Sequence, residues 1–246
     1  MNKKQYFCSA KNMDDLSSME LNSNLRALEK EWKNYYAIKE RREMTPPIFF
    51  HEKAIECCNN EDFLGKSHIE YIYAMLVSWG MHRAGKKGAK MPPYEIFRES
   101  ILRCRGCIEE LQKYRIESIS AEELNMILPR LTCLCFSIHA TTRSAKIVSS
   151  SKTLAHLLPN LVCPIDNRYT LTFFIDDIKG KSEQDIFQYI IKQMWRFYHN
   201  IDISYIKLGD TLAHSYPKVF DNLIIEYMQH NVYSKNIKQT KKQKSL

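Results

Sequence analysis

Apolar side chains recur at a helical period along most of this chain. Between Leu21 and Arg42 they return every three or four residues, while Glu, Lys and Arg occupy the other side, which is typical of an amphipathic helix. Similar patterns, bounded by prolines, glycines and capping residues, predict further helices at residues 48–58, 61–81, 92–104, 107–114, 120–136, 182–199 and 217–230. The pattern therefore predicts an all-α fold.

Capping residues and one ambiguous run refine this prediction. We expect Asn60 to cap the helix at 61–81, and Ser120 with Glu123 forms a capping box at the head of its helix. The run from Tyr169 to Ile175 is apolar and partly β-branched, so it fits either a strand or a buried helix. Because its neighbours are helical, we predict a helix there.

The composition fits a folded domain with a basic end. The 246 residues are 44% hydrophobic and include only 7 glycines and 8 prolines, which favours a sizeable helical core. We expect residues 1–233 to form a multi-helix globule, either one domain or two packed lobes. Residues 234–246 should be a basic, disordered tail.

Net charge points to a polyanionic partner without establishing one. The chain carries +8, but five lysines lie in the last twelve residues, and without these five the remainder is about +3. The tail is either a solvated end or a region that meets nucleic acid together with the body of the protein. The start of the chain has no signal-peptide pattern and no apolar stretch has transmembrane length. We therefore expect a cytoplasmic protein without membrane contact.

A glycine-rich basic stretch at residues 79–90 allows two interpretations. Three of the seven glycines and four cations lie in it, including Arg83, Lys86 and Lys87. Glycines let backbone amides approach a ligand and the cations suit phosphate. The alternative is a flexible basic connector between helices. The spacing matches neither a P-loop nor a dinucleotide fingerprint.

The cysteines could supply metal ligands only if distant helices met. Cys104 and Cys107 form a CxxC pair, and Cys133 and Cys135 form a CxC pair in an apolar helix. Tetrahedral zinc needs four ligands, but the second pair lacks the usual spacing, so buried thiols are favoured. The eight histidines show no paired-ligand spacing. We expect neither a metal nor another cofactor.

The central stretch, residues 148–170, combines a lysine and a carboxylate under backbone constraint. Leucines at helical spacing predict a short helix with Lys152 early on it. Pro159 and Pro164 then end the helix and stiffen the approach to Asp166. This arrangement suits a small catalytic site. It also suits a solvent-reaching lysine and an aspartate that caps the helix starting at Asn167.

This stretch resembles the catalytic segment of helix-hairpin-helix DNA glycosylases, especially the 8-oxoguanine type. That family has a hairpin ending in Gly-Val-Gly-Thr-Lys, then a helix, then Pro-Val-Asp. The likeness covers about two dozen of the 246 residues, and the residues that carry it are Ser149, Ser150, Ser151, Lys152, Ala155, Pro164 and Asp166. Val148 and Ser150 stand where the family has its hairpin glycines.

The resemblance implies a helix-hairpin-helix-like element and a role for each matching residue. Lys152 would be the nucleophile that forms a Schiff base, and Asp166 would stabilise positive charge on the sugar. Arg143, Lys146, Ser149, Ser150, Ser151 and Arg168 would then contact DNA, joined by the cations of the glycine-rich stretch, Arg83, Lys86 and Lys87. Candidates for a base pocket are Trp79, Phe136, His156 and Tyr169, with Trp195 as a further aromatic. For His156, a hydrogen-bonded helix histidine is the favoured alternative.

These expectations amount to a DNA glycosylase that acts on a flipped base in double-stranded DNA as a monomer. The base would be oxidised guanine or a modified base of the phage type, so the role would be base-excision repair or anti-phage defence. A lyase step is open. A helical DNA-binding module without catalysis is the alternative, as is a helical domain that binds a protein or small molecule.

Overall fold

The all-α prediction is confirmed. The structure, a computed structural model, describes residues 20–36, 44–83, 90–209 and 212–233, and this part of the chain contains helices but no strand. Helices account for 66% of the fold. The predicted tail, Lys86 and Lys87 lie outside the described residues, as do residues 37–42 of the first predicted helix.

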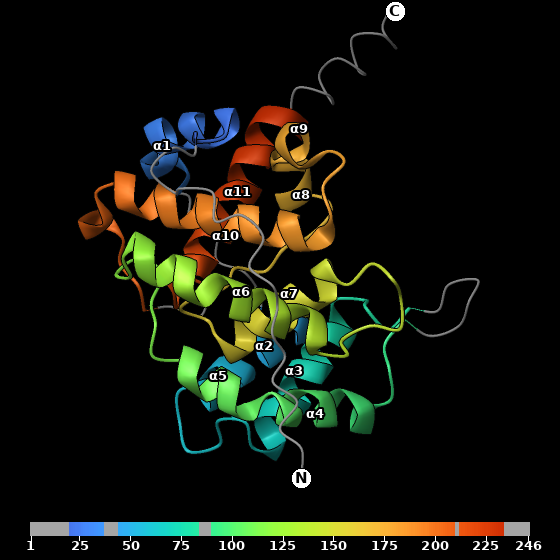
Figure 1. Cartoon of the computed structure of the whole chain (residues 1–246). Helices are drawn as coiled ribbons and strands as arrows, with labels where there is room; N and C mark the ends of the chain where they lie inside the picture. Colours follow the sequence, from blue (N-terminus) through green and yellow to red (C-terminus); the bar gives the residue numbers. More distant parts are fainter. Residues whose placement is uncertain (1–19, 37–43, 84–89, 210–211, 234–246) are drawn as a thin grey trace, which may run out of the picture.

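Figure 1 labels the helices in chain order. Their bounds are α1 Ser23–Tyr36, α2 Pro46–Cys58, α3 Lys66–Ser78, α4 Tyr94–Arg103, α5 Arg105–Leu111, α6 Ala121–Ser137, α7 Ile147–Leu157, α8 Thr170–Phe173, α9 Ile175–Ile178, α10 Glu183–Asn200 and α11 Tyr216–Met228. A 3-10 turn at Ile203–Tyr205 precedes α11, and a π-helical turn at Gln229–Tyr233 follows it.

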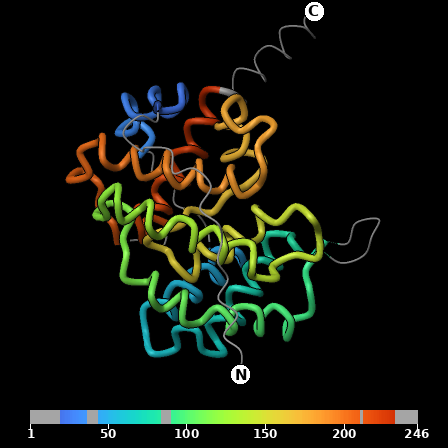
Figure 2. Tube along the Cα trace, in the orientation of Figure 1, coloured from blue at the N-terminus to red at the C-terminus, as the bar shows by residue number. Residues whose placement is uncertain are grey.

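Helix α7 lies at the centre of this arrangement. It contacts α2 and α3 on one side and α6 and α10 on the other. In Figures 1 and 2, α2 to α5 gather at one end of the molecule, and α1 with α8 to α11 at the other. The buried apolar side chains form one continuous cluster that reaches from α1 to α11. The segment between Ile147 and Pro164 is therefore held from several directions.

Local sequence signals set most helix ends as predicted. The Ser120 hydroxyl accepts from the Glu123 amide, and the Glu123 side chain accepts from the Ser120 amide, so the capping box is present. The ambiguous run from Tyr169 is helical, as α8 and α9, because Phe173 and Phe174 are both fully buried against neighbouring helices. Tertiary burial here overrides β-propensity.

The predicted helix at 61–81 is wrong at its start. Helix α3 begins at Lys66, and residues 61–64 form a turn. The Asp62 carboxylate, which precedes α3, accepts from the His68 amide at 2.9 Å and so gives a hydrogen-bond partner to an amide in the first turn of the helix. A Cβ on Gly65 would lie 2.1 Å from the Asp62 carboxylate, so this close approach requires glycine. Asn60 accepts from the Asp62 amide and caps that turn instead.

Within the described part of the chain, none of the helices has both the length and the apolar character that crossing a membrane requires.

Candidate active site

The first turn of α7 is anchored by a carboxylate from another helix. Glu183, at the start of α10, accepts from the backbone amides of Lys146 and Ile147 at 2.8 and 3.3 Å. These amides are among those that an α-helix leaves without an internal partner. A negative charge at a helix N-terminus is also favourable. The start of α7 is therefore fixed to α10 rather than to a hairpin turn of its own.

Ser151 joins α7 to the segment that carries Asp166. Its buried hydroxyl accepts from the Ile165 amide at 3.1 Å and donates to the Val148 carbonyl at 3.2 Å. Ser151 directly precedes Lys152, and Ile165 directly precedes Asp166. One hydrogen bond between these neighbours therefore sets the register of the predicted nucleophile against the predicted carboxylate.

Lys152 is half-buried and lies against an aromatic ring. Its Nζ is 4.9 Å from the centre of the Trp79 ring. Burial lowers the pKa of Lys152, and the positive charge of Lys218 acts in the same direction. The negative charges of Asp166 and Asp221 oppose this shift. Burial is the largest of these effects, so the neutral amine is easier to form here than on a solvated lysine.

Asp166 is held by the turn that follows it. Its Oδ1 accepts from the Tyr169 amide at 2.7 Å, while the Asp166 amide donates to the Thr170 hydroxyl at 3.4 Å. The predicted helix starting at Asn167 is wrong, because residues 167–169 form a turn and α8 begins at Thr170 with Tyr169 as its N-cap, so Asp166 caps the turn and not the helix. Because one carboxylate oxygen makes this bond, the side chain is fixed in direction while it retains its charge interaction with Lys152.

A second lysine–aspartate pair lies beside the first. On α11, Lys218 Nζ donates to Asp221 Oδ2 at 2.5 Å, and both side chains are largely buried. Burial raises the pKa of Asp221, and the charge of Asp166 adds to this, whereas Lys218 and Lys152 lower it. The sequence analysis missed this pair. Its only sequence signal is a lysine and an aspartate three residues apart in an otherwise apolar helix.

A pocket opens next to these charges. It lies between α2, the end of α3, α7, the 162–164 segment and the start of α11, and its cavity volume of about 10 Å³ leaves room for about one water molecule. The side chains that line it are His51, Trp79, Ala155, His156, Val162, Pro164, His214, Ser215 and Lys218. Trp79 and Lys218 both line the pocket and interact with Lys152. Lys152 itself does not line the pocket, but its amine lies against Trp79, which does.

Two of the four predicted base-pocket residues meet in this pocket. Trp79 and His156 pack edge to face, with ring centres 5.8 Å apart. Phe136 instead packs against Phe187 of α10. Tyr169 lies beside Asp166 with the Arg168 guanidinium over its ring at 5.2 Å. Trp79 and His156 therefore line this pocket, whereas Phe136 and Tyr169 do not, and the binding of a base there stays a prediction.

The predicted phosphate contacts divide by burial. Ser149, Ser150 and Ser151 are buried, because the first turn of α7 packs into the core rather than standing on a surface hairpin. Their side chains therefore offer no surface to a phosphate, and this part of the expectation is corrected.

The predicted cations remain accessible where they are described. Arg83 and Arg168 are exposed, and Arg143 and Lys146 are partly exposed. Trp195, the further aromatic, stacks on His199 within α10, and its indole Nε1 donates to the Ile119 carbonyl.

Of the cysteines in the CxxC and CxC pairs, Cys135 is buried, whereas Cys104, Cys107 and Cys133 are partly exposed, so the expectation of buried thiols holds fully only at Cys135. Cys104, Cys107 and Cys133 lie close enough to affect one another's charge, and burial raises the pKa of Cys104 and Cys107. Across the described ranges, no set of three or more His, Cys, Asp or Glu side chains is arranged to hold a metal ion.

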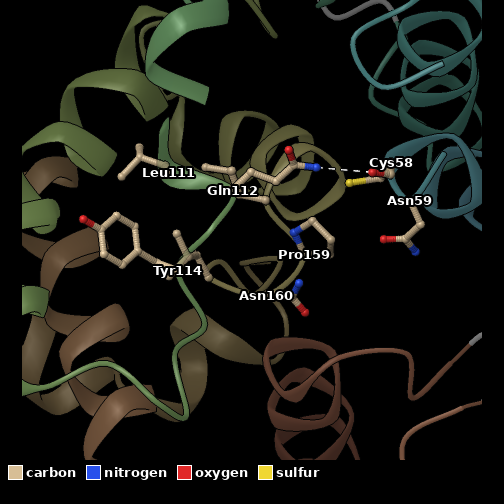
Figure 3. Close-up of a pocket in the computed structure, with 9 residues that line it drawn as sticks. Cys58, Asn59, Leu111, Gln112, Tyr114, Pro159 and Asn160 are labelled. Carbon is tan, nitrogen blue, oxygen red and sulfur yellow. Dashed lines mark hydrogen bonds between the residues drawn. The ribbon is translucent and has the colours of Figure 1, made fainter. Parts of the chain in front are cut away.

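A second pocket lies on the other side of the residues that follow α7. Its cavity volume is about 20 Å³, and it is lined by Cys58, Asn59, Leu111, Gln112, Tyr114 and residues 158–161 (Figure 3). Gln112 Nε2 donates to the Cys58 carbonyl at 3.3 Å, and the Cys58 thiol donates to the Leu157 carbonyl at 3.8 Å. This pocket contains no charged side chain among its lining residues.

No family model matches this chain, and neither the curated proteins nor the solved structures provide a match. The likeness to helix-hairpin-helix DNA glycosylases therefore depends on the quoted residues.

Proposed function

We propose that this protein is a DNA glycosylase that excises a damaged or modified base, with Lys152 as the nucleophile and Asp166 as its partner. The observation that carries this proposal is the position of Lys152, a desolvated amine beside a pocket lined by Trp79 and His156. A lysine with a lowered pKa next to a pocket and a carboxylate is a candidate nucleophile on physical grounds alone.

The amine would attack the sugar of an extruded nucleotide. The lone pair of the neutral Lys152 Nζ forms a bond to C1′, and the N-glycosidic bond breaks with its electron pair leaving on the base. The base takes up a proton, and the attached amine loses one. Opening of the sugar ring then gives a Schiff base between Nζ and C1′. Loss of a C2′ proton with departure of the 3′ phosphate would constitute the lyase step.

Asp166 would stabilise the charge that develops on the sugar. Its carboxylate is fixed by the Tyr169 amide, so it does not need to reorganise when positive charge appears. The same negative charge acts on Lys152. Because Ser151 ties the two segments together, the distance between amine and carboxylate is set by the fold and not by a flexible loop.

Aromatic and cationic side chains near Lys152 suit the rest of a glycosylase site, and the pocket, which has room for about one water molecule, would have to open to admit a base. Trp79 offers an aromatic face for an extruded base, and the buried edge of His156 lies next to it. Arg143, Lys146 and Arg168 lie close in sequence to the two predicted catalytic residues and would meet the phosphates. The base would be oxidised guanine or a phage-type modified base, so the protein would serve base-excision repair or anti-phage defence.

Borohydride trapping on a panel of duplexes tests this proposal. The panel contains an abasic site, uracil, 8-oxoguanine, hydroxymethylcytosine and glucosylated hydroxymethylcytosine. We expect a covalent adduct with at least one duplex, because hydride reduces the Schiff base to a stable secondary amine. Lys152→Gln should abolish the adduct. Lys66→Gln is the matched control, because Lys66 is exposed and pairs only with Glu70 across one helical turn.

Asp166→Asn separates charge from capping. An asparagine Oδ1 still accepts from the Tyr169 amide, so the turn should persist while the negative charge is lost. We expect base release to slow by about 10²-fold at unchanged melting temperature. Alkali-labile sites at one base without an adduct would demote Lys152 and leave Asp166 as the leading residue. Duplex binding with neither signal on any duplex would instead favour a helical DNA-binding module without catalysis.

A further inference from the structure

Three buried histidines form a chain of hydrogen bonds that ends beside Lys152. His51 Nδ1 is 2.7 Å from His156 Nε2, and His156 Nδ1 is 2.7 Å from the Lys152 carbonyl. His68 Nε2 is 3.2 Å from the His156 carbonyl, and His68 Nδ1 is 3.1 Å from the Leu64 amide nitrogen. These side chains come from α2, α3 and α7.

The partners fix the tautomers of this chain. A carbonyl only accepts, so His156 Nδ1 carries a proton and donates to Lys152. Burial lowers the pKa of His156 to about 3, so the ring is neutral near pH 7 and its Nε2 accepts. His51 Nδ1 must then be the donor. By the same reasoning, His68 accepts at Nδ1 from the Leu64 amide and donates from Nε2 to the His156 carbonyl.

The chain reaches the lysine through an aromatic ring. His156 is held between His51 and its own helix, and its ring packs against the edge of Trp79 at 5.8 Å. The face of Trp79 in turn lies under Lys152 Nζ at 4.9 Å. Because His156 is almost fully buried, its ring can turn only if the bond from His51 is lost.

We propose that His51 is a positioning residue which, through His156 and Trp79, keeps the Lys152 amine shielded from water. This inference rests on the proposed function in that Lys152 is taken as the nucleophile. His51 itself acts through other side chains. Loss of the donor at its Nδ1 position would leave His156 Nε2 buried without a partner, which favours entry of water or rotation of the ring.

Several charged groups face the same region and must stay constant in a test. Asp166 and Asp221 favour the charged lysine, and Lys218 opposes it. His214 packs on His51 with ring centres 5.1 Å apart, and His68 and His214 both act on His156. Substitutions at His51 leave all five of these groups in place, so a change in the Lys152 titration would report the hydrogen bond and the packing.

The test is an NMR titration of Lys152 after reductive ¹³C-methylation of the full-length protein. Lys152→Arg assigns the resonance. His51→Asn places an amide donor near the Nδ1 position, whereas His51→Gln, of similar polarity, places its donor near the Nε2 position. We expect the pKa of Lys152 to stay within roughly 0.3 units in the Asn variant and to rise by about 1 unit in the Gln variant, as the amine gains water.

Thermal unfolding of both variants separates positioning from general stability. A Gln variant that melts earlier but leaves the Lys152 titration unchanged would overturn the proposal, and so would identical titrations in the Asn and Gln variants. The titration requires no DNA, so its outcome is independent of the glycosylase assay. If no base is released but the pKa of Lys152 still depends on His51, the proposed function is wrong and the positioning role of His51 stands.

Discussion

Two small pockets border the residues at the end of α7, and burial has opposite chemical consequences beside them. The pocket near Lys152 has a cavity volume of about 10 Å³, and the pocket lined by Cys58 one of about 20 Å³ (Figure 3). Burial lowers the pKa of Lys152 and raises that of Cys58 to about 12. In both groups the neutral form is favoured.

The reactive form differs between the two side chains. A lysine attacks as the neutral amine, whereas a cysteine attacks as the thiolate. The same desolvation therefore makes Lys152 more nucleophilic and Cys58 inert. The ionisable groups that converge on Lys152, namely Asp166, Lys218 and Asp221, distinguish the first pocket as the candidate active site.

The largest expected effect concerns the thiol. With a pKa of about 12 against an ordinary 9.0, Cys58 should be alkylated roughly 10³-fold more slowly in the folded protein than in denaturant at pH 8. Iodoacetamide labelling followed by peptide mass spectrometry measures both rates. Cys58→Ala confirms the assignment of the peptide. Equal rates with and without denaturant would break the comparison, since the second pocket would then hold a reactive nucleophile.

Lowering the pH should destabilise the fold through His68 and His156. Burial lowers the pKa of His68 to about 4 and that of His156 to about 3, from an ordinary 6.5. The unfolded chain therefore binds more protons than the folded one below pH 6.5, and stability falls as pH decreases. Between pH 7 and pH 5 each histidine should reduce the free energy of unfolding by about 2 kcal/mol.

Urea unfolding at the two pH values measures this loss. His68→Gln is the informative variant, because glutamine can accept from the Leu64 amide and donate to the His156 carbonyl without titrating. Its stability should depend on pH less steeply than that of the wild type, by about 2 kcal/mol over the same interval. A parallel dependence in both proteins would show that His68 is not a buried neutral ring.

The smallest expected effect is a difference in stability between substitutions at two adjacent serines, Ser150 and Ser151. Ser151→Ala removes the acceptor of the Ile165 amide and should cost about 1–3 kcal/mol of stability. It should also slow adduct formation, because Lys152 and Asp166 lose their shared register. The Ser150 hydroxyl is buried without a hydrogen-bond partner, so Ser150→Ala should be neutral or stabilising. Equal losses from both substitutions would contradict the role assigned to Ser151.

The helical pattern predicted most elements, and its failures have local causes. The capping boxes and prolines placed α2, α4, α6, α10 and α11 close to their observed bounds. Helix α3 starts late because Asp62 reaches over Gly65 to the His68 amide. Helical periodicity gives no information about that side-chain contact. The run after Tyr169 was ambiguous because burial on several sides, rather than propensity, makes it helical.

The candidate site was predictable only where it is local in sequence. Lys152 and Asp166 share one constrained stretch, so their proximity followed from the helix and the prolines. Phe136 is aromatic and near in sequence, yet it packs on Phe187 away from the pocket. His51 comes from a helix a hundred residues earlier, and Lys218 and Asp221 from one far later. No pattern within α2 or α11 indicates that they meet α7.

The sequence by itself thus determined an all-α chain, its main helix ends, and the neighbourhood of one lysine and one aspartate. Tertiary structure decided what surrounds them: the burial of Ser149 to Ser151, the Ser151–Ile165 bond, the histidine chain and the second ion pair. The physical reason is range. Periodicity and capping depend on residues within a few positions, whereas desolvation and charge at Lys152 depend on side chains that only the packed fold brings together.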